Sequence, residues 1–545
     1  MIKLHNFYLL HLYSFTLLGL IGSFLLYFAE PEWSFIDSFF TSFSSVTDTG
    51  LTNVSLEQTR FISRIIIIML FQIGSPIFWT IIPVIQRRRF LMKSFNHPIH
   101  PKNPSTYKSR ILKPLPLYSF SIEYHAMSRL LIVLSVYIIS LYLFGFLCLS
   151  LRFILSPSSR FIAEQAGGWK FFTIFHVISA TTNCGLSLFN SSMTPFSNDP
   201  CILIPSMILI VLGQTGFPIA LRVIIYQRSK RSRYGPVYSY LLEHGRSVYT
   251  HLFSSVETLY LLFWWIIFFI FQFSAILIFD YHHFPEEGLL HLLNAVFMTI
   301  STRVAGFSTI EISSVSPPML IIYMLLHILA VTPFISVLRS SAETIKPSEE
   351  PKGFNSALRR FVSSQQSNPW VRDFFWVYFS WLVLTITVYK QFDGAFLFSL
   401  LFEVSSSYGN IGLSMGTGVP TEPSLAAVTG VFGKLVLCLV MIAGRHRDLP
   451  SSGYTLDRAV TTITFEGMAE EVLHLLPVKE MEKMEIGTPR EKVKEVSVRS
   501  PLLVDSQRDE IELTMSRNYL DYPSIKSNRD NELVKLKSSI NDLYM

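Results

Sequence analysis

The amino-acid sequence predicts an all-α polytopic membrane protein, with eight transmembrane helices arranged as four membrane-pore-membrane repeats around a central pore. Three observations support this prediction. Half of the 545 residues are hydrophobic and only 15% are charged, which is typical of membrane proteins. Eight apolar runs are long enough to span a bilayer, and one short glycine motif recurs four times in register with them.

The apolar runs set the order of the predicted helices, because about 20 apolar residues can cross the hydrocarbon core of a bilayer. They lie at about 7–28, 61–85, 127–150, 202–226, 252–279, 318–338, 372–389 and 424–443. The first run is longer than the apolar region of a secretory signal, and no small-x-small cleavage site follows it. We therefore interpret it as the first membrane helix.

The eight runs form four successive pairs, and a shorter, partly apolar segment lies between the two runs of each pair. These segments are 33–47, 169–182, 288–302 and 393–407, and each leads into a polar stretch that contains glycine, most clearly in Phe402–Gly416. None is long enough to cross the membrane. Irregular backbone at this depth is tolerated only where it is buried in protein or lines a watery cavity. The pattern predicts a helix, a half-helix, a pore-lining turn and a second helix, repeated four times.

The four polar stretches align on Gly50, Gly185, Gly306 and Gly412. Of the 26 glycines in the chain, these four alone begin a Gly-[Leu/Phe]-[Ser/Thr] tripeptide. Internal repetition of this kind indicates one structural unit used several times. The repeats are expected at about 1–86, 126–227, 251–340 and 370–450, within one pore domain over residues 1–460.

The loops between repeats are basic. They contain Arg87, Arg88, Arg89, Lys93, Lys102, Lys108, Arg110 and Lys113, then Arg228, Lys230, Arg231, Arg233 and Arg246, then Arg339, Lys346, Lys352, Arg359 and Arg360. The connections on the other face lean acidic, with Glu30, Glu32, Asp280, Glu286 and Glu287. The positive-inside rule places the basic loops and both termini in the cytoplasm, and we expect the plasma membrane. The net charge of +6 thus reflects membrane orientation rather than binding to nucleic acid.

Residues 461–545 are expected to form a cytoplasmic, largely disordered tail. From Lys479 onward the last 67 residues hold twelve Lys/Arg and thirteen Asp/Glu, with few aromatic residues. Such a segment buries too little apolar surface to fold alone. A weak helix at about 530–543 is a candidate docking segment for a partner that the sequence does not identify.

The glycine stretches suit the chemistry of a cation filter. Glycine allows backbone dihedrals closed to other residues, so four such turns around an axis can aim carbonyl oxygens at a dehydrated monovalent cation. The C-terminal dipole ends of the half-helices would favour a cation at the same place. A single glycine would more simply permit close helix packing, but four in register with the same flanks favour the filter.

The segments TDTGLT, TTNCGLS, TRVAGFS and YGNIGLS, followed by GKLVLCLVMIAGRHRDLP, resemble the four pore loops and last helix of the Trk/Ktr/HKT superfamily of potassium and sodium transporters. The resemblance spans Met1 to about Val460. It implies that the four aligned glycines form the selectivity filter, flanked by Thr49, Cys184, Ala305 and Ile411. It also implies that glycine at position 50 goes with potassium permeation, where serine would go with sodium, and that the protein forms a homodimer with one pore per subunit.

Charges near the predicted pore have two interpretations each. Lys434 is expected near the middle of the last membrane helix, where an ionisable residue is expensive. The resemblance implies a charge facing the permeation path below the filter, whereas the plainer alternative is an ion pair with Glu403 or Asp393. Arg445 and Arg447 either act in gating or simply end a helix at the cytoplasmic face.

Other polar motifs have plainer explanations. Asp48 begins an Asp-Thr-Gly tripeptide, but the protease chemistry of that motif needs two carboxylates sharing a proton, and no second copy exists. We expect Asp48 to cap local backbone or to add negative charge at the pore mouth. His176 and His446 match no metal-binding spacing, and His176 is expected to be a packing residue. Thr332 and Pro333 are expected either to kink the sixth helix into a movable constriction or to form an ordinary kink.

The four cysteines, Cys148, Cys184, Cys201 and Cys438, show no disulfide or zinc spacing. No cofactor is expected, only membrane lipid and the transported potassium or sodium held by backbone. The leading hypothesis is inward transport of potassium, with some sodium. A sodium-selective transporter or a cation symporter is the alternative. A multi-pass membrane enzyme or scaffold is more remote, because no catalytic constellation converges.

Overall fold

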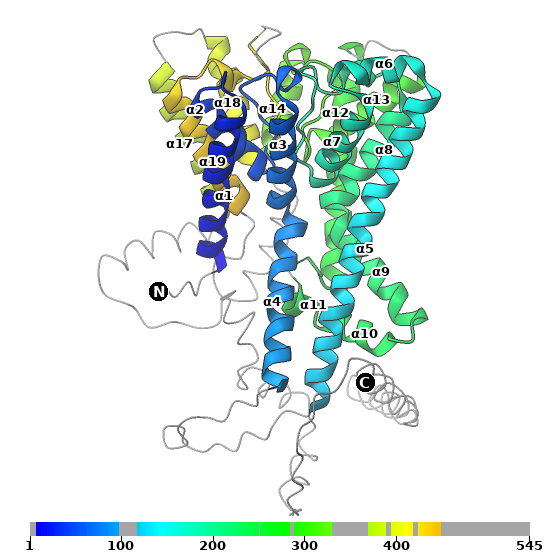
Figure 1. Cartoon of the computed structure of the whole chain (residues 1–545). Coiled ribbons are helices and arrows are strands. Elements are labelled where there is room, and N and C mark those ends of the chain that lie inside the picture. The colour runs from blue at the N-terminus through cyan, green and yellow to red at the C-terminus, as the bar shows by residue number, and fades with distance from the viewer. Residues whose placement is uncertain are drawn as a thin grey trace, which may run out of the picture. The chain divides into compact units, whose positions relative to one another are not determined.

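The computed structural model describes residues 7–96, 117–249, 251–283, 288–329, 369–388, 394–417 and 423–447. The chain divides into two units, Met1–Val472 and Leu473–Met545, and every described residue belongs to the first. The predicted tail at 461–545, Thr332 and Pro333 therefore lie outside the described residues. Within the described residues the structure is helical and contains no strand (Figure 1).

The first repeat contains α1 (Phe7–Ala29), the half-helix α2 (Phe35–Val46), α3 (Phe61–Gly74) and α4 (Pro76–Asn96). The Ser34 hydroxyl caps α2 by accepting a hydrogen bond from the backbone N–H of Asp37, which satisfies one of the free donors at the helix start. Helices α3 and α4 meet at a bend of 56°, where Pro76 interrupts the backbone ladder. Together α3 and α4 occupy the single apolar run predicted at 61–85.

The second repeat contains α5 (Leu117–Leu155), α6 (Pro157–Gln165), the half-helix α7 (Trp169–Thr182), α8 (Pro200–Ile210), the π-helical turn η3 (Val211–Thr215) and α9 (Phe217–Arg231). Helices α8 and α9 are bent by 81°. A π-helical turn and a following proline, Pro218, account for this bend. The short helices α10 (Gly235–Glu243) and α11 (Gly245–Val248) follow.

The third repeat contains α12 (Ser255–Phe279), the half-helix α13 (Leu289–Ser301) and α14 (Pro317–Ile328). The fourth contains α17 (Pro369–Val388), the half-helix α18 (Gly394–Gly409) and α19 (Val431–His446). Short 3₁₀ turns lie at η1 (Leu56–Gln58), η2 (Thr194–Phe196), η4 (Tyr281–His283), η5 (Ile312–Ser314) and η6 (Leu425–Ala427). All four half-helices lie within two residues of the segments predicted from sequence, which confirms those elements.

The membrane class is supported by the length and surface of the helices. Three helices are long and apolar enough to span a bilayer, or five if each bent pair counts as one span, among the residues searched. Helix α12 exposes a row of large apolar side chains, including Val256, Leu259, Phe263 and Ile278, each more than half exposed. An apolar surface of this extent fits a lipid contact. The predicted count of eight spanning helices stays a prediction.

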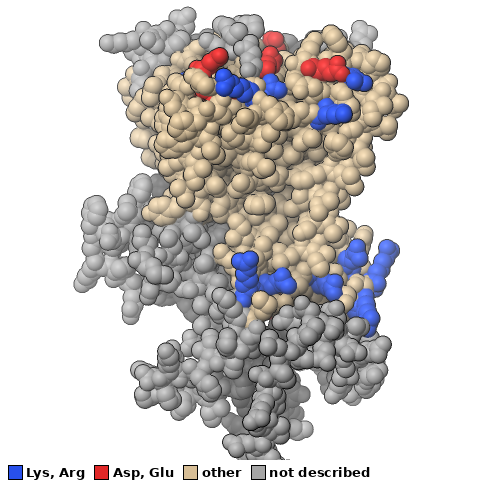
Figure 2. All heavy atoms as spheres, viewed as in Figure 1, with Lys and Arg blue, Asp and Glu red and all other residues tan. Residues whose placement is uncertain are grey.

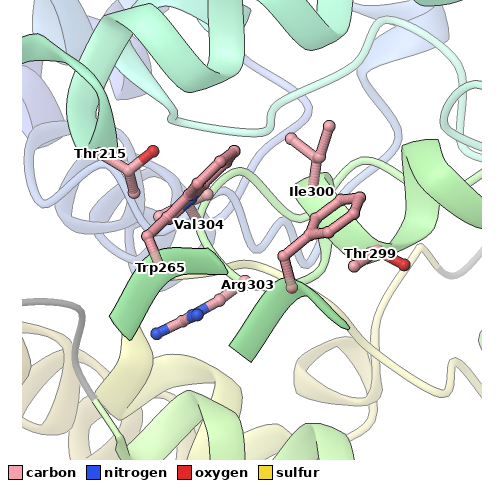
Figure 3. A pocket seen from close by; sticks show the side chains of 7 residues that line it. Thr215, Trp265, Thr299, Ile300, Arg303 and Val304 are labelled. Carbon is pink, nitrogen blue, oxygen red and sulfur yellow. The ribbon is translucent and has the colours of Figure 1, made fainter. Parts of the chain in front are cut away.

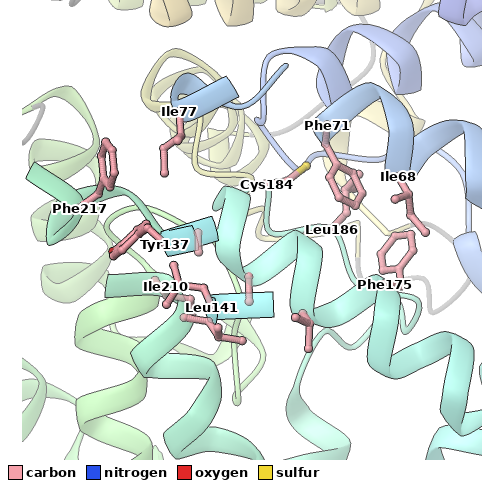
Figure 4. Close-up of a cluster of buried hydrophobic side chains, with 14 of the residues drawn as sticks. Ile68, Phe71, Ile77, Tyr137, Leu141, Phe175, Cys184, Leu186, Ile210 and Phe217 are labelled. Atoms are coloured by element: carbon pink, nitrogen blue, oxygen red, sulfur yellow. The ribbon is translucent and has the colours of Figure 1, made fainter. Parts of the chain in front are cut away.

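Buried apolar clusters join each repeat to its neighbours. Figure 4 shows α3 and α4 of the first repeat packed against the second repeat, where the rings of Phe71 and Phe175 lie 5.6 Å apart in an edge-on arrangement. A second cluster joins Phe40 and Phe43 of α2 to Tyr408 and other residues of the fourth repeat. Helices α1 and α2 accordingly lie beside α17–α19 in Figure 1. The first and last repeats are therefore neighbours, and the order of repeats closes into a ring.

Charge is distributed unevenly between the two ends of the helices. Figure 2 shows Lys and Arg without Asp or Glu among the coloured residues at the lower end, and both signs at the upper end. The last turn of α9, with Arg228, Lys230 and Arg231, lies at the lower end. This distribution follows the positive-inside pattern.

Candidate ion pathway

The four aligned glycines lie directly after the four half-helices and share an unusual backbone conformation. Their φ angles are positive, at 83° for Gly50, 77° for Gly185, 67° for Gly306 and 88° for Gly412. Residues with a side chain rarely adopt this region, whereas glycine does so without steric cost. The recurring glycine is therefore required by the backbone in every repeat.

The surroundings of the four glycines form a closed ring. A Cβ atom added to Gly50 would overlap the carbonyl oxygen of Cys184, and the same relation joins Gly185 to Ala305, Gly306 to Ile411 and Gly412 to Thr49. Each glycine thus packs against the carbonyl of the residue that precedes the aligned glycine of the next repeat. The glycine of the fourth repeat packs in the same way against the first repeat. The structure brings all eight residues predicted for the filter and its flanks into one ring of alternating α-carbons and carbonyl oxygens.

Backbone conformation also explains why the residues two positions before three of the aligned glycines are Asp48, Asn183 and Asn410. These three residues have φ angles of 51°, 59° and 52°, in the left-handed region that Asn and Asp tolerate better than other side chains. The fourth aligned residue, Val304, has no positive φ. The expectation that the Asp48 side chain caps local backbone is wrong: among the described residues Oδ1 has no hydrogen-bond partner, and Oδ2 has a charged partner instead.

That partner is Arg445, near the end of α19. Its Nη2 donates to Asp48 Oδ2 at 2.9 Å, and the side chains are only 10% and 3% exposed. Arg445 also donates to the backbone carbonyl of Gly74, so it joins the last helix to both the half-helix and the second helix of the first repeat. A basic residue that merely ends a helix at the surface would be solvated, whereas the Arg445 side chain is largely shielded from solvent.

Arg447, the residue that directly follows α19, contacts the third repeat. Its guanidinium donates to the carbonyl of His327 at 3.2 Å and lies 3.5 Å from those of Ile328 and Gly409. The two arginines of the Gly-Arg-His-Arg motif therefore join the fourth repeat to the first and to the third. A role in gating stays a prediction for Arg445 and Arg447, and their position between repeats is compatible with it.

Three further glycines, missed by the sequence analysis, support the ends of the half-helices. An added Cβ would overlap the carbonyl oxygen of Val46 at Gly74, of Thr181 at Gly213 and of Tyr408 at Gly444. In these three repeats the carbonyl belongs to the residue four positions before the aligned glycine. The second helix can approach the half-helix this closely only because it has no side chain there. The available signal was a glycine within or directly after the second apolar run of the first, second and fourth repeats.

Lys434 lies elsewhere than expected. Helix α19 begins at Val431, so Lys434 is in its first turn rather than near its middle. Its Nζ lies 2.7 Å from Asp37 Oδ1 in the first turn of α2, near the start of the half-helix and away from the end that leads to Gly50. An ion pair is present, as the alternative interpretation expected, but its partner is Asp37 and not Glu403. Glu403 instead accepts a hydrogen bond from the backbone N–H of Ala426 at 3.2 Å, and Asp393 lies outside the described residues.

The ring closure explains the partner of Lys434. Asp37 and Lys434 are 397 positions apart in the chain, and they meet because α19 packs beside α2. Asp37 also accepts hydrogen bonds from the Ser34 hydroxyl and the Asn53 amide, each at 2.5 Å. The ion pair thus belongs to a small polar network that joins the last repeat to the first.

Neutralising Lys434 is expected to change the conductance. Lys434→Gln removes a positive charge near the start of the first half-helix and leaves Asp37 with neutral partners, at a cost of about 1–3 kcal/mol. We expect a smaller inward current or altered rectification in voltage clamp. If the pair acts as a unit, Asp37→Asn has a similar effect and the double variant adds little. Normal currents from Lys434→Gln would reduce the pair to a structural role.

His176 is confirmed as a packing residue. Its ring stacks on Phe172 at 5.7 Å with an interplanar angle of 2°. Its Nε2 lies 2.8 Å from the Ser206 hydroxyl, whose own proton goes to the Ile202 carbonyl at 2.7 Å. The imidazole therefore donates to Ser206, and its buried nitrogen is satisfied.

A buried arginine behind the third loop was also missed. Arg303, three positions before Gly306, is 8% exposed and its guanidinium lies 4.4 Å from the centre of the Phe268 ring. It lines a small cavity with Trp265 and Thr215 (Figure 3). Its Nε and Nη2 atoms have no hydrogen-bond partner in the described part of the chain. Burying an unpaired cation of this kind costs free energy of folding. Nothing in the local sequence pattern predicted that Arg303 would be buried.

Together, the four half-helices, the ring of glycines and carbonyls into which they lead and the lipid-type helix surface define the class: a polytopic membrane protein. The family model TrkH, described as a cation transport protein, matches residues 2–462. The chain therefore belongs to this family. The match confirms the resemblance to the Trk/Ktr/HKT superfamily and the expectation of a transporter family rather than an enzyme family.

Several proteins are similar to the chain. A Dictyostelium discoideum protein is 33% identical over 352 residues, which are 63% of this chain and 51% of that protein. Potassium transporter TRK1 of Candida albicans is 32% identical over 367 residues, 62% of this chain and 34% of that protein. Cation transporter HKT2;4 of Oryza sativa subsp. japonica is 25% identical over 481 residues, 82% of this chain and 92% of that protein. The chain thus spans about half or less of the first two relatives.

Among solved structures, the potassium transporter TrkH from Vibrio parahaemolyticus is similar to the chain. The TM-score is 0.47 at 17% sequence identity, with 82% of this chain and 84% of that chain covered.

Proposed function

We propose that this protein conducts potassium, with some sodium, inward across the plasma membrane down the electrochemical gradient. The observation that carries the proposal is the closed ring in which four glycines alternate with the carbonyl oxygens of Thr49, Cys184, Ala305 and Ile411. Carbonyl oxygens around an axis can replace the hydration shell of a monovalent cation. The C-terminal ends of four half-helices lead into the ring, and their dipoles favour a positive charge there.

Potassium is proposed as the main ion for two reasons. The TRK1 relative is named a potassium transporter, and glycine occupies position 50, where the family resemblance implies that serine would favour sodium. The filter would hold the ion by backbone oxygens alone, without a cofactor. A sodium-selective transporter or cation symporter is the second candidate, favoured by the similarity to a rice protein named for cations in general.

In this proposal each repeat contributes two membrane-spanning helices, eight in total, with each bent pair counted as one span. The basic last turn of α9 supports a cytoplasmic position for the loops between repeats and for both termini. We also propose, from the family resemblance, a homodimer in the lipid bilayer with one pore per subunit. The tail at 461–545 would bind a cytoplasmic partner.

Ion substitution tests the proposed function directly. The full-length chain is expected to restore growth at low potassium to cells that lack potassium uptake, and to carry a current whose reversal potential follows external potassium more than sodium. Cells with the empty vector are the control. A reversal potential that followed sodium alone would favour the second candidate. A chain that conducted neither ion would contradict the proposal.

A further inference from the structure

The fourth pore loop is hydrogen-bonded to the first loop through one side chain. Asn410, two positions before Gly412, donates from Nδ2 to the Thr49 hydroxyl at 2.8 Å and to the Met441 carbonyl at 3.0 Å. The Met441 carbonyl can only accept, so it fixes the orientation of the amide. Both protons of Nδ2 are then used, one toward α19 and the other toward Thr49.

The Thr49 hydroxyl is linked in turn to the half-helix α2 by further hydrogen bonds. It lies 2.7 Å from the Thr47 hydroxyl, and Thr47 donates its own proton to the Phe43 carbonyl at 2.7 Å. Because Thr47 has one proton, Thr49 must be the donor in the contact between the two hydroxyls. The chain therefore runs from Asn410 through Thr49 and Thr47 to the backbone of α2, and every step is buried or part-buried.

Thr49 is fully buried and contacts the fourth repeat in two ways. Its hydroxyl accepts from Asn410, and its carbonyl oxygen is the one on which Gly412 packs. The side chain that orients Thr49 and the glycine that lies against its carbonyl thus come from the same loop, two residues apart. A displacement of Asn410 would move one of the four carbonyl oxygens of the ring.

The equivalent residues in the other repeats make different contacts. Asn183 has the same left-handed backbone, but its amide donates within its own repeat, to the Ile210 carbonyl at 3.1 Å and to Gln214 at 3.2 Å. Asp48 is paired with Arg445 on a helix, and Val304 has an apolar side chain. In the part of the chain that the structure describes, Asn410 alone of these four reaches a loop residue of another repeat.

We propose that Asn410 is a positioning residue for ion selectivity, which holds the Thr49 carbonyl at its place in the ring by donating to the Thr49 hydroxyl. This inference rests on the proposed function, since it assigns the determinant of the selectivity of the same filter. Carbonyl filters discriminate between potassium and sodium through the placement and field of their oxygens. If one carbonyl oxygen is held less firmly, sodium should therefore permeate more readily, and the protein should still conduct ions.

The test is a double-variant cycle on the full-length chain, read as the sodium-to-potassium permeability ratio from reversal potentials. Asn410→Gly removes the amide while keeping the left-handed backbone accessible, and Thr49→Val removes the hydroxyl at similar volume. Each is expected to raise the ratio about fivefold, the equivalent of one hydrogen bond. The double variant is expected to raise it no further, because both changes break the same contact.

Two control variants separate positioning from general damage. Thr49→Ser retains the hydroxyl and is therefore expected to raise the ratio less than Thr49→Val does. Asn183→Gly makes the same change in the second repeat, where the amide has no contact with Thr49, so its effect should add to that of Thr49→Val. An unchanged ratio in a conducting Asn410→Gly variant, or full additivity of Asn410→Gly and Thr49→Val, would overturn the proposal.

If Asn410→Gly carries no current, the purified chain provides a second measurement. The rise in melting temperature when sodium is replaced by potassium should persist in Thr49→Ser and be lost in Thr49→Val. An equal rise in both would overturn the inference. The wild-type chain tests the proposed function separately: failure of that function is seen as a missing potassium current before any variant is compared.

Discussion

Gly50→Ser is expected to reduce the potassium current more than the sodium current. Gly50 has a φ of 83°, and a side chain there would be strained and would overlap the Cys184 carbonyl. The first loop or that carbonyl must move, which changes the oxygen positions on which potassium selectivity depends. We expect the sodium-to-potassium permeability ratio to rise about tenfold, equal to about 1.4 kcal/mol, in voltage-clamp recordings with the two ions exchanged.

Gly288→Ser is the matched control for this prediction. Gly288 has a similar φ of 78°, but an added Cβ would meet no atom within 4 Å. The substitution therefore carries the backbone strain of a positive φ without displacing a carbonyl of the ring. Unchanged reversal potentials for both ions in Gly50→Ser would mean that the assignment of Gly50 to the filter is wrong.

Arg445→Gln is expected to destabilise the protein strongly. The substitution leaves the carboxylate of Asp48, which is only 3% exposed, without its charged partner, and it removes the hydrogen bond to the Gly74 carbonyl. Removing one member of a buried ion pair typically costs about 3–5 kcal/mol. We expect a lower melting temperature of the purified chain and less protein at the cell surface, both measured against the wild type.

The double variant Asp48→Asn with Arg445→Gln should recover part of this loss, since it no longer buries a single unpaired charge. Arg160→Gln provides the control at an exposed ion pair: Arg160 and Glu164 are 49% and 46% exposed, and such pairs contribute about 0–1 kcal/mol. Wild-type stability of Arg445→Gln would contradict the prediction. So would a double variant no more stable than the single one, because the charge of Asp48 would then not be the cause.

The local elements of the pore domain could be predicted closely from sequence. The half-helices α2, α7, α13 and α18 were identified because short apolar segments ended in glycine-containing polar stretches, and a local pattern of that kind reports local structure. The bends within the runs predicted at 61–85 and 202–226 were not identified. The single run predicted at 202–226 is two helices bent by 81°, since hydropathy measures apolar character and is insensitive to a π-helical turn inside an apolar segment.

The partners of the charged and polar groups could not be predicted. Lys434 was assigned to carboxylates near it in sequence, whereas its partner is 397 positions away. Asn410 and Thr49 are separated by 361 positions. Arg303 drew no attention because its burial depends on α12 packing over it. In each case the contact is made between repeats, and periodicity within a segment holds no information on which repeats are adjacent.

The sequence by itself determined the class of the protein, the four half-helices and the glycine that follows each of them, because hydrophobic length and backbone conformation are properties of short segments. The tertiary structure alone decided that the fourth repeat packs against the first. That closure puts Thr49 against Gly412, Asp48 against Arg445 and Asp37 against Lys434. The physical reason is that ring closure depends on the packing of whole helices through buried clusters such as Phe40, Phe43 and Tyr408, and not on any one segment.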